Sequence, residues 1–170
     1  KLMSILNRER VQPHDVFFIP AGRVHTIGKG LIIAEIQQTS DVTYRIHDFD
    51  RVDTKGSKRE LHNDLAIEAI DFTIPDSYKT IYERSSSEQV IGTSNYFTTK
   101  RRLLNKSTTL NFDHSSCTVL MCIEGSYDVS YFDELPTISK GDTVLVPSCI
   151  EELRLRPQSN GILLEIKIPY

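Results

Sequence analysis

The second half of the sequence most constrains the fold, because short apolar segments alternate there with turn residues. Short strands separated by turns are typical of a β-sandwich or a β-barrel. The pattern predicts strands over Tyr96 to Leu104, Thr108 to Phe112, Thr118 to Ile123, Ser126 to Phe132, Thr143 to Val146, Glu152 to Leu155 and Ile162 to Ile168. Glu124-Gly125 and Lys140-Gly141-Asp142 supply turns between them.

The first half is less regular but carries more chemistry. Val16 to Ile19 is an uninterrupted apolar run, Leu31 to Gln37 alternates apolar and polar residues, and Thr43 to Phe49 alternates around Arg45. All three read as strands. Apolar residues recur every three or four positions over about residues 61–70, which predicts one short helix.

A change in composition predicts a domain boundary. Glu83 to Gln89 (ERSSSEQ) is polar and poor in hydrophobic residues, which is typical of a mobile linker. The sequence therefore predicts one domain over residues 1–84 and a second, all-β domain over residues 85–170.

The two predicted domains share an internal repeat. Asp15-Val-Phe-Phe-Ile-Pro20 matches Asp142-Thr-Val-Leu-Val-Pro147, a strand followed by a proline corner. The step that leads from Pro20 to His25 leads from Pro147 to Glu152. We expect the second unit to keep the scaffold of the first without its histidine.

Composition gives little direction about partners. The net charge of −3 gives no electrostatic reason to expect nucleic acid or an anionic membrane as a partner. No apolar run is long enough to span a bilayer, and no secretory signal pattern is found. The 3 cysteines cannot all pair and do not form a C-x-x-C motif, so we expect reduced thiols in a cytoplasmic protein.

The most specific motifs lie between Asp15 and His62. The spacing Asp15, Pro20, x, Gly22, x, x, His25 resembles the second motif of a cupin, a small jelly-roll β-barrel. The runs GRVHTIGKG, EIQQTSDVTYRIHDFDR and RELH resemble the signature of class I mannose-6-phosphate isomerases, zinc enzymes that interconvert mannose 6-phosphate and fructose 6-phosphate. This resemblance implies a mainly β fold: the remainder of a cupin-type jelly roll (double-stranded β-helix), a second, degenerate cupin-like unit and one short helix.

The resemblance also implies roles for individual residues. His25 would be a zinc ligand, Arg45 the catalytic arginine, and Asp41 and Glu35 would lie in the sugar site. The family's other zinc ligands, a histidine in a Gln-x-His element and a glutamate, come earlier in its chains, so we expect them upstream of Lys1. The chain would then be a C-terminal portion that binds zinc poorly and is nearly inactive alone. Its uncovered strand edges would favour self-association.

The implied chemistry suits these residue types. Aldose–ketose isomerisation passes through an enediol with negative charge on oxygen, which a Lewis acid or a fixed cation stabilises. The guanidinium of Arg45 is always charged and offers planar donors. The proton-transferring base stays open among Glu35, Asp41 and His47.

Other interpretations remain open at this level. The chain would alternatively be a non-catalytic cupin module that binds sugar or protein, or a self-contained cupin enzyme that uses another metal. His25 would then be an ordinary corner residue, and Arg45 a cross-strand ion-pair partner of Asp48 or Asp50. In the same way Asp41 would merely cap a turn, and Glu35 would lie on the solvated face of a strand.

Overall fold

The structure, a computed structural model, describes residues 2–40, 42–130 and 136–168. Its contacts divide the chain into two compact units. The first unit combines Lys1–Val16 with Lys79–Tyr170, and the second is Phe17–Tyr78. These two units do not test the predicted domains, residues 1–84 and 85–170. The domain boundary between residues 84 and 85 stays a prediction.

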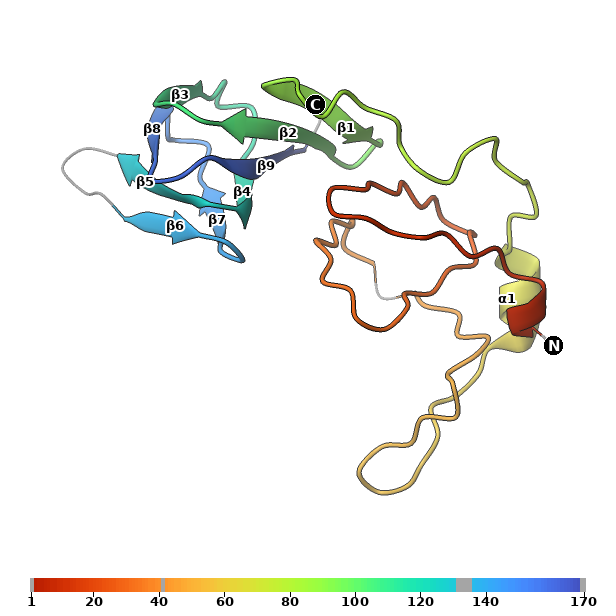
Figure 1. The fold of residues 1–170 in the computed structure, drawn as a ribbon. Helices are drawn as coiled ribbons and strands as arrows, with labels where there is room; N and C mark the ends of the chain where they lie inside the picture. The colour runs from red at the N-terminus through yellow and green to blue at the C-terminus, as the bar shows by residue number, and fades with distance from the viewer. Residues whose placement is uncertain (1, 41, 131–135, 169–170) are drawn as a thin grey trace. The chain divides into compact units, whose positions relative to one another are not determined.

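Nine strands and two short helices form the regular structure of the described residues. They are η1 (Leu2–Ser4), α1 (Asn63–Ala69), β1 (Glu88–Thr93), β2 (Thr98–Leu104), β3 (Thr108–Asn111), β4 (Thr118–Glu124), β5 (Ser126–Ser130), β6 (Thr137–Ser139), β7 (Thr143–Val146), β8 (Glu152–Pro157) and β9 (Gly161–Lys167). All nine strands lie in the first unit (Figure 1).

The strands form two antiparallel sheets, one of five strands in the order β1-β2-β9-β4-β7 and one of four in the order β3-β8-β5-β6. From β2 onward the chain passes to the other sheet at each step except from β5 to β6, and Figure 1 shows β4 and β5 in different sheets. This arrangement confirms the predicted mainly β, jelly-roll type of fold.

The hydrophobic core is built from one face of each sheet. Alternate residues of β4, β5 and β8 are buried, as the two-residue period of a strand requires. The core residues are Leu104, Leu110, Phe112, Leu120, Cys122, Tyr127, Val129, Ile138, Val146, Leu153, Leu155 and Leu163. The central strand β9 is buried on both faces from Gly161 to Ile166, and it pairs with β2 on one side and β4 on the other.

The strands predicted in the second half are confirmed with small changes at their ends. For the predicted strand from Ser126 to Phe132, the last two residues lie outside the described residues. Two strands, β1 and β6, were not predicted. Part of the predicted linker is therefore wrong, since Glu88 and Gln89 belong to β1. Strand β1 pairs antiparallel with β2, and its first residue Glu88 also forms ion pairs with Lys100 and Arg102 of β2.

The three strands predicted in the first half, Val16 to Ile19, Leu31 to Gln37 and Thr43 to Phe49, are wrong. In the described part of that region only an isolated bridge between Val52 and Lys58 has β pairing. A strand needs a neighbour that satisfies its backbone N–H and C=O groups, and the alternation of side chains does not supply one. The predicted helix is confirmed as α1.

Candidate active site

Arg45 lies in one arm of a long hairpin-like loop in the second unit, drawn in orange to yellow in Figure 1. The loop turns at Asp53, whose Oδ1 accepts hydrogen bonds from the N–H groups of Lys55 (2.8 Å) and Ser57 (2.9 Å). Gly56 has a φ of 81°, a left-handed conformation that favours glycine. Lys55 and Gly56 thus form a turn that returns the chain alongside Arg45.

The returning arm holds Arg45 through three hydrogen bonds. The N–H of Arg45 donates to Nδ1 of His62 at 3.1 Å, and the N–H of His62 donates to the carbonyl of Arg45 at 2.8 Å. The guanidinium Nη1 donates to the carbonyl of Glu60 at 3.2 Å. The peptide groups and the side chain of Arg45 are thus fixed by one short segment.

His25 follows the predicted proline corner. Gly22 has a φ of 82°, and its carbonyl accepts from the N–H of Asp71 at 3.0 Å. A Cβ at Gly22 would lie 2.7 Å from the carbonyl oxygen of Ala69, so only glycine fits there. His25 itself is exposed, and its Nδ1 lies 2.9 Å from the carbonyl of Arg23. If that nitrogen carries the ring proton, Nε2 is left with its lone pair toward solvent.

Helix α1 connects these two positions. Its N-cap residue His62 bonds to Arg45, and Asp71, just after its C-terminal end, bonds to Gly22. With a rise of about 1.5 Å per residue, the two attachment points are roughly 13 Å apart along the helix axis. The helix therefore braces the corner that carries His25 against the arm that carries Arg45.

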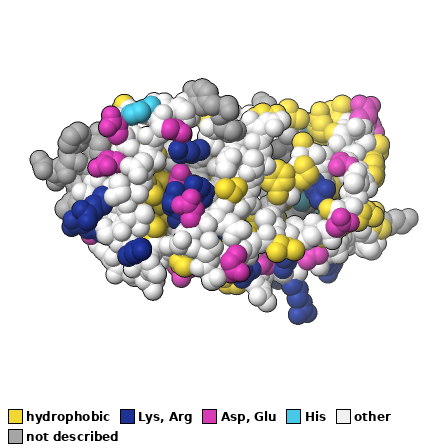
Figure 2. Space-filling model, turned by 90° about the horizontal axis from the view of Figure 1, so that it is seen from above, with side chains coloured by type: hydrophobic (Ala, Val, Ile, Leu, Met, Phe, Trp, Pro, Cys, Tyr) yellow, Lys and Arg dark blue, Asp and Glu magenta, His cyan; other side chains and the backbone are white. Residues whose placement is uncertain are grey.

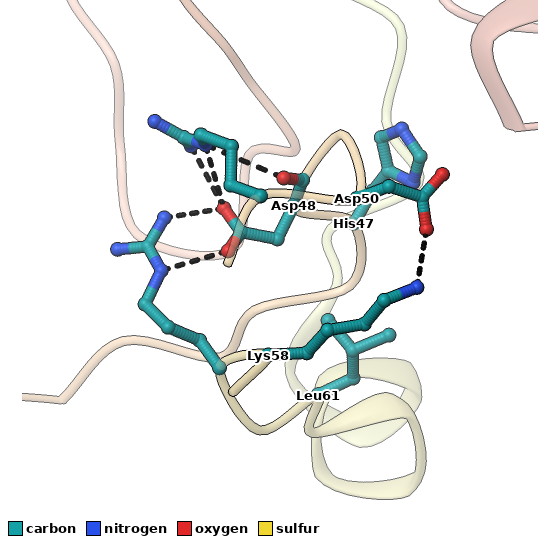
Figure 3. A pocket seen from close by; sticks show the side chains of 7 residues that line it. His47, Asp48, Asp50, Lys58 and Leu61 are labelled. Carbon is teal, nitrogen blue, oxygen red and sulfur yellow. Dashed lines mark hydrogen bonds and ion pairs between the residues drawn. The ribbon is translucent and has the colours of Figure 1, made fainter. Parts of the chain in front are cut away.

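A small pocket of about 100 Å³ opens beside the same hairpin-like loop (Figure 3). The residues that line it are His47, Asp48, Asp50, Arg51, Lys58, Arg59 and Leu61. Asp48 is the centre of its charge network and is only 7% exposed. Its Oδ1 accepts from Nη2 of Arg51 at 2.8 Å, and its Oδ2 accepts from Nε of Arg59 at 2.8 Å.

This network sets the protonation of its carboxylates. The hydrogen bond from Arg59, together with the positive charges of Arg59 and Arg51, lowers the pKa of Asp48 to about 2 although burial acts in the opposite direction. Lys58 lies 2.7 Å from Asp50 and lowers its pKa in the same way. Because Asp48 and Asp50 bind these other cations, neither accounts for the position of Arg45.

The sequence prediction missed this network. The charge pattern could have revealed it: DFDR (residues 48–51) is followed by KRE (residues 58–60), which places acidic and basic residues on facing arms of a turn. The other predicted site residues are less informative. Glu35 is exposed in an extended segment, and Asp41 lies outside the described residues.

A metal site is incomplete in the part of the chain that the structure describes. No group of three or more His, Cys, Asp or Glu side chains lies close enough there to hold an ion. His25 offers one nitrogen, whereas a zinc site needs three or four protein ligands. The described residues thus fit a zinc ion only as the source of a single ligand.

Comparison with known proteins gives these features a context. No family model matches the sequence. Over 165 residues the chain is 35% identical to mannose-6-phosphate isomerase ManA of Bacillus subtilis (strain 168), which covers 94% of this chain and 51% of that protein. The chain thus spans about half the length of the curated relatives it matches.

Solved structures agree with the sequence comparison. The crystal structure of the mannose 6-phosphate isomerase from Bacillus subtilis superposes with a TM-score of 0.63 and 27% identity, covering 76% of this chain and 41% of that one. A zinc-bound mannose 6-phosphate isomerase shares the fold with a TM-score of 0.54 and 13% identity, covering 67% of this chain and 29% of that one.

The two antiparallel sheets define a jelly-roll type of β protein, and the two solved structures named above share its fold. Over nearly its whole length the chain is homologous to mannose-6-phosphate isomerases, of which it spans about half. The resemblance found in the GRVHTIGKG and EIQQTSDVTYR runs is thereby confirmed. No helix among the described residues is long and apolar enough to cross a membrane.

Proposed function

We propose that this chain forms part of the active site of a zinc-dependent isomerase that interconverts mannose 6-phosphate and fructose 6-phosphate. The observation that carries the proposal is the 35% identity to a mannose-6-phosphate isomerase over 94% of the chain. The residues proposed to act are His25 as a metal ligand, Arg45 as the catalytic cation, and Asp41 and Glu35 as sugar-site residues.

The chemistry assigned to Arg45 follows from its charge and its restraint. Moving a proton between two carbons beside a carbonyl places negative charge on oxygen, and a preorganised cation stabilises that charge without first having to reorient. Two hydrogen bonds of its backbone and one of its guanidinium hold Arg45 in place, which supports such a role. Among the described residues its guanidinium makes no other hydrogen bond, so the remaining N–H groups can donate to an enediolate or to a phosphate.

The proposal assigns His25 the part of one zinc ligand among several. The contact of Nδ1 with the Arg23 carbonyl supports this assignment, because metal-binding histidines commonly orient one ring nitrogen in this way. The other ligands are proposed to come from residues beyond those described here. Since one imidazole does not fix a coordination geometry, the 170-residue chain alone should bind zinc weakly.

The test measures fructose 6-phosphate formed from mannose 6-phosphate, together with bound zinc. We expect only trace turnover from the isolated chain with added zinc. We expect zinc-dependent turnover from the longer gene product proposed to contain it, lost in His25→Ala and kept in a His114→Ala control. A longer product without zinc or turnover would instead favour a non-catalytic cupin module. Robust turnover by the isolated chain would refute the proposal that ligands are missing.

We further propose that the isolated chain self-associates in the cytoplasm. Figure 2 shows hydrophobic side chains that reach the surface among charged ones. Ile32, Phe72 and Ile74 are 98%, 76% and 82% exposed. Apolar surface of this kind favours association. Sedimentation velocity over a range of concentrations tests this, and a concentration-independent monomer would contradict it.

A further inference from the structure

His62 occupies an unusual position at the start of α1. It is the N-cap residue of the helix, yet its side chain makes no capping hydrogen bond. Side chains at this position commonly accept from the N–H of the second or third helical residue, which stabilises the helix. The acceptor nitrogen of His62 is used instead for the N–H of Arg45, at 3.1 Å. The helix therefore lacks a side-chain capping hydrogen bond from His62, because the ring accepts from the N–H of Arg45 instead.

The hydrogen bond defines which form of the imidazole is required. A backbone N–H can only donate, so Nδ1 of His62 must carry a lone pair and the ring proton must lie on Nε2. The carboxylate of Glu60 lies 3.9 Å from Nε2, on the side where this proton is. The side chain of His62 is 25% exposed, with the ring of Tyr44 at 6.3 Å between centroids. The neutral Nε2–H tautomer is the one that satisfies these neighbours.

Residues 60–62 hold Arg45 from three directions. His62 receives the N–H of Arg45 on its ring and donates its own N–H to the carbonyl of Arg45, while the Glu60 carbonyl receives Nη1. Of these three bonds, the ring bond is the only one in which residues 60–62 take part through a side chain. We infer that His62 is a positioning residue, whose neutral imidazole fixes the backbone of Arg45 and hence the direction of its guanidinium. This inference rests on the proposed function for its catalytic meaning.

Nuclear magnetic resonance of the ¹⁵N-labelled 170-residue chain tests the inference without any turnover. In the unmodified chain at neutral pH, the ring nitrogens of His62 should report an unprotonated Nδ1 and a protonated Nε2. The Nε–H signal of Arg45 should be single and sharp. A ring protonated on Nδ1, or on both nitrogens, would overturn the inference even if no variant folds.

The variant His62→Ala should leave the helix in place but release Arg45. We expect its Arg45 amide to exchange with solvent about tenfold faster, as for a lost hydrogen bond, and its Nε–H signal to broaden. The control His114→Ala, which removes a histidine of the first unit, should change neither signal. Unchanged Arg45 signals in His62→Ala would refute the inference. If the proposed isomerase function is wrong, the turnover assay will show no activity, while the magnetic resonance signals of His62 and Arg45 will still be as expected.

Discussion

Asp15 and Asp142 close the same kind of turn at equivalent places in the two halves of the internal repeat. Oδ2 of Asp15 accepts from the N–H of Gln12 at 3.0 Å, and Oδ2 of Asp142 accepts from the N–H of Ser139 at 2.8 Å. In both turns the aspartate N–H donates back to the carbonyl of the same earlier residue, at 3.1 and 2.9 Å.

The equivalence extends to the residues on either side. His14 and Gly141, each just before its aspartate, both have positive φ values, 70° and 99°. After the two prolines, the N–H of Arg23 donates to the carbonyl of Pro20 at 3.3 Å, and that of Ile150 donates to Pro147 at 3.1 Å. The repeat seen in the sequence is therefore also a repeat of local geometry, although only the second copy forms regular strands.

The two aspartates differ in their long-range partners, which gives a matched pair of variants. Asp15 also binds Lys79 and Arg84, each at 2.7 Å, and its side chain is 7% exposed, whereas Asp142 makes no ion pair with the described residues. Asp15→Asn should lower the urea midpoint more than Asp142→Asn, because an asparagine keeps the turn but not the ion pairs. Hydrogen exchange over residues 79–84 should quicken only in Asp15→Asn. Equal midpoints would show that the ion pairs add no stability.

The network around Asp48 should make stability depend on acid. The pKa of Asp48 is lowered to about 2 in the folded chain, from an ordinary value of 3.8. Its stabilisation is thus complete above about pH 4 and is lost as the pH falls through the range toward 2. The difference in unfolding free energy between the unmodified chain and Asp48→Asn should shrink over that range.

Denaturant unfolding at a series of pH values measures this difference. Glu35→Gln is a suitable control because that carboxylate is exposed. A difference between the unmodified chain and Asp48→Asn that stays constant down to pH 2 would contradict the assigned pKa.

Gly22 should be far less tolerant of a side chain than Gly28. In Gly22→Ala the new methyl would lie 2.7 Å from the Ala69 carbonyl oxygen, in a backbone conformation with φ of 82°. We expect a loss of roughly 1–3 kcal/mol in unfolding free energy, from backbone strain and the clash with the end of α1. Gly28→Ala meets no atom within 4 Å and should be nearly neutral. Equal effects, measured by urea unfolding, would mean that the corner is not packed on the helix.

Tyr127 should contribute a buried hydrogen bond to the core. It is fully buried, and its hydroxyl donates to the carbonyl of Glu124 at 3.0 Å, across the turn between β4 and β5. Tyr127→Phe should cost about 1 kcal/mol of unfolding free energy, since the ring stays packed while the carbonyl loses its hydroxyl partner. Tyr96→Phe, at an exposed site, is the control and should change little. A neutral Tyr127→Phe would indicate that another group satisfies the Glu124 carbonyl.

Most of the strands of the first unit can be predicted from local sequence. Two-residue alternation in β4 and β8 identifies the core face, and glycines at positions 125 and 141 adopt the positive φ values that their turns need. Strand β1 could not be found in this way, because it begins in a polar stretch and its pairing with β2 joins residues that lie apart in the sequence.

The sequence by itself determined that this chain is mainly β, that it carries an internal repeat, and that His25 follows a rigid corner, because strand alternation and proline and glycine conformations are local properties. Only the tertiary structure decided that Asp48 is buried between two arginines and that His62 receives the N–H of Arg45. Those contacts join residues on opposite arms of a loop, and no local pattern specifies which side chains will meet once the chain has turned back on itself.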